Sequence, residues 1–217
     1  NFASTSSQDA AAGTGWTAAN KRWGAGGLMF DATNDFVLAG TNALPTGGSA
    51  LNDFSVEMWI NPTKVTGNQV FFVQQASSPR LGDFYGYIDL TGGGTLYSCR
   101  FLGSANNGDS FSIPTTGIQP GMWHHMVFTW SGGASGTKKI YIDGVDKVGT
   151  TANNVNCGNF GNVPNTAIGA AYTSYPTNAI IDSTRIYSRA LTAAEILANY
   201  QAGNIELQTR TSADNST

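Results

Sequence analysis

The sequence predicts an all-β fold, a sandwich or jelly roll, with one short helix near its C-terminal end. Apolar residues recur with a period of two rather than 3.6, which is the pattern of strands. Strand-like segments follow one another about every ten residues and are punctuated by Gly, Pro and Asn, as in sandwiches. Glycine supplies 27 of 217 residues, well above the usual share of about 7%.

The strand candidates differ in how their apolar residues are arranged. Apolar and polar residues alternate from Phe54 to Trp59, whereas 125–130 is apolar enough for a central strand buried on both faces. Asp143-Gly144 predicts a tight turn between the strand that begins at Lys139 and a following strand over 147–150. The remaining candidates are 36–39, 69–74, 85–90, 96–101, 110–113, 167–169 and 179–187.

One helix is predicted after these strands. Thr192 and Glu195 form a capping box, Ile196, Leu197 and Tyr200 form a short apolar stripe, and Gly203 is placed to end the helix. A helix of about two turns must pack on another element to be stable. We expect one domain over residues 12–203, with an extension at 1–11. Residues 204–217 hold a strand-like run and a polar tail, which we expect to lead to a further domain.

Composition excludes several classes of partner. Charged residues make up 12% of the chain, about half the usual 25%, and the net charge is −3. Lys21-Arg22 and Lys138-Lys139 are the largest basic clusters, so nucleic acid is not an expected partner. No apolar run approaches the ~18 residues of a membrane span. The Thr-, Asn-, Gly- and Ser-rich composition favours an extracellular or cell-surface location.

The two cysteines, Cys99 and Cys157, are expected to form a disulfide. An even number of cysteines in a chain of extracellular composition usually pairs. The alternative is two unpaired, partly buried thiols, and the sequence leaves both open.

Five segments, in order, carry a resemblance to a known family. They are Leu28–Val37, Phe54–Pro62, Gly121–Trp130, Lys139–Gly144 and Ile181–Leu191. Together they resemble the laminin G-like, pentraxin-like branch of the concanavalin A-like lectin/glucanase superfamily. The resemblance implies two antiparallel sheets packed as a jelly roll, one of them concave. Lectins, adhesion modules, carbohydrate-binding modules and glycosidases all use this fold, so the fold alone does not decide the function.

The resemblance also implies a structural Ca²⁺ site. It brings together two segments that contain Asp31, Asn34 and Asp182, and carboxylate and amide oxygens are suitable calcium ligands. The chain departs from the family where Ala32 replaces the usual Gly and where Ser183 stands in place of an acid or amide. The alternative is a metal-free turn in which the two aspartates accept backbone N–H bonds.

Neither a zinc site nor a catalytic site is expected. His124 and His125 are adjacent on a strand, so their rings point to opposite faces and serve structural roles. Glycoside hydrolysis needs a pair of acids, and Glu57 is the only Glu within the predicted strands. Asp83 and Asp89 make an unconvincing pair. We therefore expect no enzyme.

Aromatic residues in Gly- and Asn-rich segments are the candidates for ligand binding. Sugars stack on aromatic faces, and the loop 169–178 offers Tyr172 and Tyr175, with Tyr85 and Tyr87 as further candidates. Alternatively, these rings pack on the sandwich. The tryptophans of the strand pattern, which are Trp59, Trp123 and Trp130, are expected in the core.

These observations favour a non-catalytic extracellular recognition module within a larger surface or secreted protein. Its expected partner is a glycan or glycoprotein surface, through carbohydrate binding or adhesion. The alternatives are a ligand-free structural domain of a surface assembly or fibre, and a glycoside hydrolase or lyase.

Overall fold

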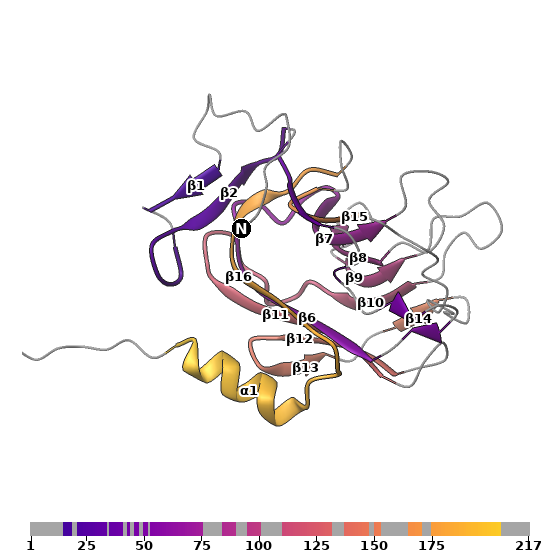
Figure 1. Ribbon diagram of the computed structural model, residues 1–217. Helices are drawn as coiled ribbons and strands as arrows, with labels where there is room; N and C mark the ends of the chain where they lie inside the picture. The colour runs from indigo at the N-terminus through magenta and orange to yellow at the C-terminus, as the bar shows by residue number, and fades with distance from the viewer. Residues whose placement is uncertain are drawn as a thin grey trace, which may run out of the picture.

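The chain folds into two antiparallel sheets that pack face to face, with one helix outside the first sheet (Figure 1). This confirms the predicted jelly-roll sandwich. The computed structural model describes residues 15–18, 21–33, 35–40, 43, 46–47, 50–51, 53–75, 84–89, 95–100, 110–131, 137–147, 150–152, 165–170 and 175–204. No helix in these ranges is long and apolar enough to cross a membrane.

Each main sheet has seven strands. In spatial order, the first sheet consists of β1 (Gly15–Thr17), β2 (Gly27–Asp31), β16 (Asn178–Tyr187), β6 (Phe54–Pro62), β11 (His124–Ser131), β12 (Thr137–Ile142) and β13 (Val145–Lys147). The second, in the same manner, consists of β14 (Thr150–Ala152), β10 (Ser110–Pro114), β9 (Thr95–Arg100), β8 (Phe84–Asp89), β7 (Gln69–Gln75), β15 (Asn165–Ile168) and β3 (Val37–Gly40). A small pair, β4 (Thr46–Gly47) and β5 (Ala50–Leu51), stands apart from both.

The core lies between the two main sheets. From β6, Val56, Met58 and Ile60 face inward, and they pack with side chains of the second sheet such as Phe72 and Ile168. All five are nearly or fully buried. Deleting such a side chain, for example Met58→Ala, typically costs about 2–5 kcal/mol.

The turn between β12 and β13 is tighter than predicted. Ile142 pairs directly with Val145, so Asp143 and Gly144 alone form the turn. Both have positive φ, 54° and 77°, as the two central residues of a type I′ hairpin turn require. The strand predicted over 147–150 was therefore wrong: β13 begins at Val145, and Thr150 already belongs to the second sheet.

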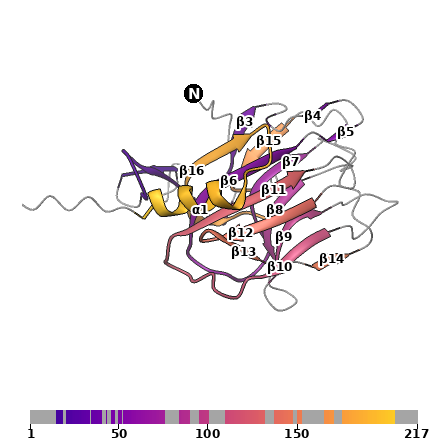
Figure 2. The same ribbon diagram turned by 90° about the horizontal axis from the view of Figure 1, so that it is seen from below.

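The helix α1 (Ala193–Ala202) covers the outer face of the first sheet, and Figure 2 shows it in front of that sheet. The predicted capping box is present: the Thr192 hydroxyl accepts the Glu195 N–H, and the Glu195 carboxylate accepts the Thr192 N–H. The Arg189 guanidinium and the Thr192 bonds lower the pKa of Glu195 to about 2. The predicted stripe was partly wrong, because Ile196 is buried but Leu197 is 42% exposed.

Gly203 ends the helix, but its backbone conformation does not explain why this position needs a glycine. Its φ of −66° is open to any residue. A glycine is needed because the Trp59 ring lies too close for a side chain: a Cβ at this position would lie 2.2 Å from Cζ2 of Trp59. Trp59 and Trp130 are buried as predicted, whereas the prediction for Trp123 was wrong, because it precedes β11 and is only half-buried.

Candidate functional site

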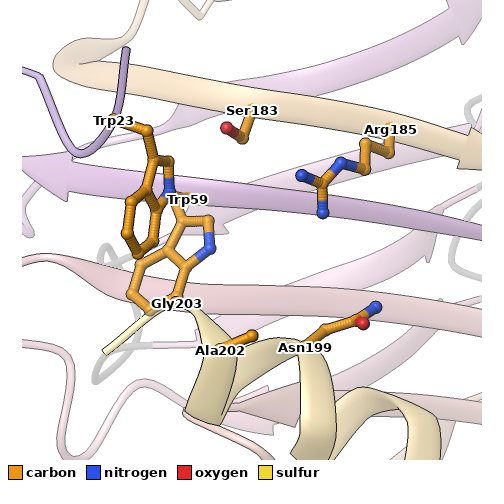
Figure 3. A pocket seen from close by; sticks show the side chains of 7 residues that line it. All are labelled: Trp23, Trp59, Ser183, Arg185, Asn199, Ala202 and Gly203. Atoms are coloured by element: carbon orange, nitrogen blue, oxygen red, sulfur yellow. The ribbon is translucent and has the colours of Figure 1, made fainter. Parts of the chain in front are cut away.

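A pocket of about 300 Å³ lies on the outer face of the first sheet, where α1 ends. We call it the α1 pocket. Strands β6 and β16, the segment before β2 and the last turn of α1 enclose it (Figure 3). Its lining residues are Trp23, Trp59, Ser183, Arg185, Asn199, Ala202 and Gly203.

Two tryptophans form one wall of the α1 pocket. The rings of Trp23 and Trp59 meet edge to face, with centroids 5.9 Å apart and planes at 81°. The Arg22 guanidinium lies 5.1 Å from the Trp23 ring centroid and 4.7 Å from that of Trp59. It also donates to the Gly203 carbonyl at 2.8 Å and to Oδ1 of Asn204. Arg22 therefore ties the wall to the end of the helix.

Asp182 of β16 holds the segment that carries Trp23. Its Oδ2 accepts the backbone N–H groups of Arg22 and Trp23, each at 3.0 Å. Its Oδ1 accepts the N–H of Ser183 at 2.7 Å. Both oxygens are thus used to position backbone, a role in which the negative charge strengthens each bond.

A β-bulge at Ser183 aims Arg185 into the pocket. Asp182 pairs with Trp59 and Arg185 pairs with Glu57, so β16 has one residue more than β6 in this stretch. Ser183 takes the left-handed conformation, with φ of 51°. Because side chains alternate between faces along a strand, the extra residue places Asp182 and Arg185 on the same, outer face. Figure 3 shows Arg185 reaching from β16 toward α1.

A buried carboxylate, Glu57 of β6, lies behind Arg185 and is only 1% exposed. Its Oε1 contacts Nε2 of His125 at 2.8 Å. Its Oε2 accepts hydrogen bonds from the Tyr187 hydroxyl and from Nδ2 of Asn199, the latter at 3.2 Å. The network joins β6, β11, β16 and α1, so it fixes both the helix and the pocket residue Asn199.

The network also sets two protonation equilibria. Burial raises the pKa of Glu57. This effect is outweighed by the hydrogen bonds from His125 and Tyr187 and by the charges of His125 and Arg185, so the pKa lies below its ordinary value. Burial raises the pKa of Tyr187, and its bond to the Glu57 carboxylate adds to this. Glu57 is therefore a carboxylate, and Tyr187 keeps its proton, at neutral pH.

The two histidines face opposite sides of β11, as predicted. Nδ1 of His124 lies 2.8 Å from Oδ2 of Asp143, and Nε2 of His124 accepts the N–H of Gln119 at 2.9 Å. His125 instead reaches Glu57 and packs against Trp59, with ring centroids 5.0 Å apart. Each ring holds neighbouring segments together.

The structure does not bring together Asp31 and Asp182, two of the three predicted calcium ligands. Asp31 pairs with Asn178, and Asp182 lies four residues further along β16, which is roughly 13 Å at about 3.3 Å per residue. Oδ1 of Asp31 accepts the N–H of Thr33 at 2.8 Å. Asn34 lies outside the described residues, which include no group of three or more His, Cys, Asp or Glu side chains suited to a metal. The described residues do not fit one ion shared by both aspartates, and calcium binding stays a prediction.

Among the predicted ligand-binding tyrosines, the structure describes the side chain of Tyr175, and it does not line the α1 pocket. Tyr175 is half-buried and packs against Val70, Val73 and Ala167 of the second sheet. Its carbonyl accepts the N–H of Val70 at 3.0 Å. Tyr172 and the side chains of Tyr85 and Tyr87 lie outside the described residues. So do Cys157 and the side chain of Cys99, and the predicted disulfide stays a prediction.

The pocket residues were not predicted as a site. Trp59 was assigned to the core by its apolar strand, while Trp23, Arg185 and Asn199 carried no recognised motif. They lie on four segments that only the sheet order and the docked helix bring together. One sequence signal pointed to this place: Asp182-Ser183, where the chain departs from the family pattern.

The arrangement can hold a small polar ligand that has one apolar face. The half-buried Trp23 offers aromatic surface, with the buried Trp59 behind it, and Arg185, Asn199 and Ser183 offer polar groups from β16 and α1. Binding pockets commonly combine such apolar lining with a few polar groups that fix orientation.

A comparison with protein-family models agrees with the observed jelly-roll fold. The laminin G model of the Concanavalin A-like lectin/glucanases superfamily matches residues 31–197, so the chain belongs to this superfamily. No curated protein sequence matches the chain.

Three solved structures illustrate the similarity. A heptameric SAP-like pentraxin from Limulus polyphemus has a TM-score of 0.56 and 19% identity, covering 78% of each chain. Domain 4 of AbnA, a GH43 extracellular arabinanase from Geobacillus stearothermophilus, has a TM-score of 0.52 and 20% identity, covering 80% of this chain and 75% of that one. The CBM40 of Ruminococcus gnavus IT-sialidase has a TM-score of 0.59 and 14% identity, covering 80% of this chain and 96% of that one. At these identities the three structures show a shared fold and no more.

Proposed function

We propose that this domain is a non-catalytic carbohydrate-binding module and that the α1 pocket is its sugar site. One observation carries the proposal: a tryptophan pair, a guanidinium and a carboxamide converge on one pocket of about 300 Å³. A sugar ring has an apolar C–H face that packs on an aromatic side chain, and a rim of hydroxyls that hydrogen-bonds to planar polar groups. The pocket offers both.

The similar structures support the ligand class. Domain 4 of AbnA is described in complex with arabinotriose, and the Ruminococcus gnavus CBM40 as bound to α2,3 sialyllactose. The AbnA enzyme is also described as extracellular, which agrees with the low charge of this chain. We infer a module outside the cell that binds a glycan or glycoprotein surface as part of a longer protein.

The carboxylates near the α1 pocket favour binding over catalysis. Glycosidases place two carboxyl groups on either side of the scissile bond. Glu57 is 1% exposed and already bonded to His125, Tyr187 and Asn199. Asp182 uses both oxygens on backbone N–H groups. Neither carboxylate is placed to protonate a leaving group or to attack a sugar.

The test is to fill the pocket without removing any of its contacts. Ala202 lines the α1 pocket and is exposed at the end of α1, so Ala202→Trp blocks the pocket. Ala194→Trp is the matched control, because Ala194 is exposed two turns earlier on the same helix and does not line the pocket. A glycan array identifies a ligand, and titration calorimetry compares the variants.

We expect Ala202→Trp to weaken binding at least about 10-fold, the equivalent of 1.4 kcal/mol, and Ala194→Trp to bind as wild type. Wild-type affinity in Ala202→Trp would place the sugar elsewhere and contradict the proposed site. If no glycan binds the wild type, the alternative of a ligand-free structural domain holds instead.

A further inference from the structure

We propose that the sugar bound in the α1 pocket carries a carboxylate, and that the guanidinium of Arg185 binds it. This inference rests on the proposed function, since it concerns the same pocket. It follows from the hydrogen-bond donors and acceptors that the described residues leave for a ligand.

The carboxylate acceptors around the pocket are already used. Glu57 accepts from the Tyr187 hydroxyl and the Asn199 amide at one oxygen and contacts His125 at the other. Asp182 accepts three backbone N–H groups. A neutral sugar offers many hydroxyl donors, and these two carboxylates, the strongest acceptors nearby, are not open to them.

The strongest donor at the pocket is more than half exposed, although its guanidinium also interacts with the Tyr187 hydroxyl. The Arg185 side chain is 55% exposed, and its nearest carboxylate contact is a single 3.8 Å approach of Nη1 to Oε1 of Glu57. That distance is an ion pair without a hydrogen bond. A guanidinium presents five N–H donors in a planar fork that matches the two oxygens of a carboxylate. The pocket is therefore rich in donors and poor in free carboxylate acceptors, and it complements an anionic ligand group.

A second arginine adds positive charge but is not itself available. Arg22 lies over the Trp23 and Trp59 rings and donates to Gly203 and Asn204. Its positive charge still lies beside the pocket and adds to that of Arg185. Arg185 is thus the group that contacts the ligand, and Arg22 supports it electrostatically.

The size of the pocket limits the ligand. About 300 Å³ lies at the lower end of the range for small-molecule sites, which suits roughly one sugar ring with its substituents. Carboxylated sugars come from two sources, the uronic acids and the nonulosonic acids such as sialic acid. Both present a carboxylate beside a pyranose ring, so the geometry fits the shared chemistry and the experiment separates the sources.

The experiment compares each acid with its uncharged counterpart by titration calorimetry. One pair is methyl β-glucuronide and methyl β-glucoside, and the other is the methyl α-glycoside of N-acetylneuraminic acid and its carboxyl methyl ester. The proteins compared are the wild type, Arg185→Gln and Arg185→Lys. Lys64→Gln is the control, because Lys64 is exposed, does not line the pocket, and loses the same charge.

We expect one of the two acids to bind about 10- to 100-fold more tightly than its counterpart, as charge-assisted hydrogen bonds imply. Arg185→Gln should abolish this preference, Arg185→Lys should retain part of it, and Lys64→Gln should leave it unchanged. Added salt should weaken binding of the acid only.

Two results would overturn the inference, and they differ in what they say about the proposed function. If the neutral sugars bind as well as the acids and Arg185→Gln changes neither, the carboxylate assignment is wrong while sugar binding stands. If neither acid nor neutral sugar binds, and the array also finds no ligand, both proposals fail together.

Discussion

Replacing Gly203 with alanine tests how tightly the end of α1 is fitted against the sheet. The added Cβ would lie 2.2 Å from Cζ2 and 3.0 Å from Cε2 of Trp59, and 3.1 Å from Cζ2 of Trp23. A separation of 2.2 Å is far below van der Waals contact, so one side must move. The Trp59 ring has little room to do so, because it is 3% exposed and packs against His125 and Tyr200.

Two effects of opposite sign decide the magnitude. At a φ of −66° alanine is compatible with the backbone, and the restriction of the unfolded chain alone would stabilise the fold by about 0.5–1 kcal/mol. Overpacking of a well-packed site typically costs about 1–3 kcal/mol. We therefore expect Gly203→Ala to lose about 1–2 kcal/mol of unfolding free energy. In a chain of this size that lowers the melting midpoint by roughly 2–8 °C.

Urea and thermal unfolding followed by circular dichroism measure this loss, and a double mutant identifies its origin. Trp59→Phe makes room for the new Cβ. The double mutant Trp59→Phe/Gly203→Ala should therefore lose less unfolding free energy than the two single mutants lose in total. Midpoints for Gly203→Ala equal to or above the wild type would refute the argument. So would strict additivity, which would assign the loss to something other than the clash.

Three further predictions concern other parts of the fold. Asp182→Ala should lower the unfolding free energy by about 2–3 kcal/mol, because three backbone N–H groups lose their acceptor. We expect the same loss in EDTA and in Ca²⁺. A loss seen only in Ca²⁺ would establish the calcium site instead. Since the pKa of Glu57 lies below its ordinary 4.5, its ionisation stabilises the folded state at neutral pH, and this contribution is lost as the pH falls through the folded value. The stability difference between wild type and Glu57→Gln should therefore shrink below about pH 4.5, whereas a difference constant from pH 7 to pH 3 would contradict the network. Thiol titration in denaturant should find no free thiol if Cys99 and Cys157 pair, and two reactive thiols would disprove the disulfide.

Local features of the sequence predicted local structure well. The capping box at Thr192 and Glu195 and the turn at Asp143-Gly144 depend on residues within a few positions of one another, and both formed. The period of two in β6 predicted a strand, and the apolar run of β11 predicted a central one. The two strands pair with each other in the middle of the first sheet.

Local sequence patterns could not predict the α1 pocket, because the first sheet is covered on one face by the second sheet and on the other by α1. Val56 and Met58 of β6 face the second sheet, while Glu57 and Trp59 face the helix side. All four are buried. Hydrophobicity alone cannot distinguish a tryptophan in the core from one under a helix, so Trp59 was assigned correctly as buried and its place in a pocket wall was missed.

The extra residue of the bulge at Ser183 decides which face of β16 carries Arg185. In β16, Ala179 and Ile181 face the core, and strict alternation from them would turn Arg185 inward, where an arginine is not tolerated without a partner. The extra residue at Ser183 reverses the alternation, so Ile186 joins the core and Arg185 faces the helix.

The same bulge serves both halves of the site. Asp182, before it, fixes the backbone that carries Trp23, and Arg185, after it, reaches the pocket. A non-glycine residue held at a positive φ costs free energy that the surrounding structure must offset. At Ser183 the offset includes the bond from its N–H to Asp182, so the strained residue is held by the very carboxylate that positions the aromatic wall. A regular β16 would avoid that cost, but it could not present an anchoring carboxylate and a pocket-lining guanidinium three residues apart on one face.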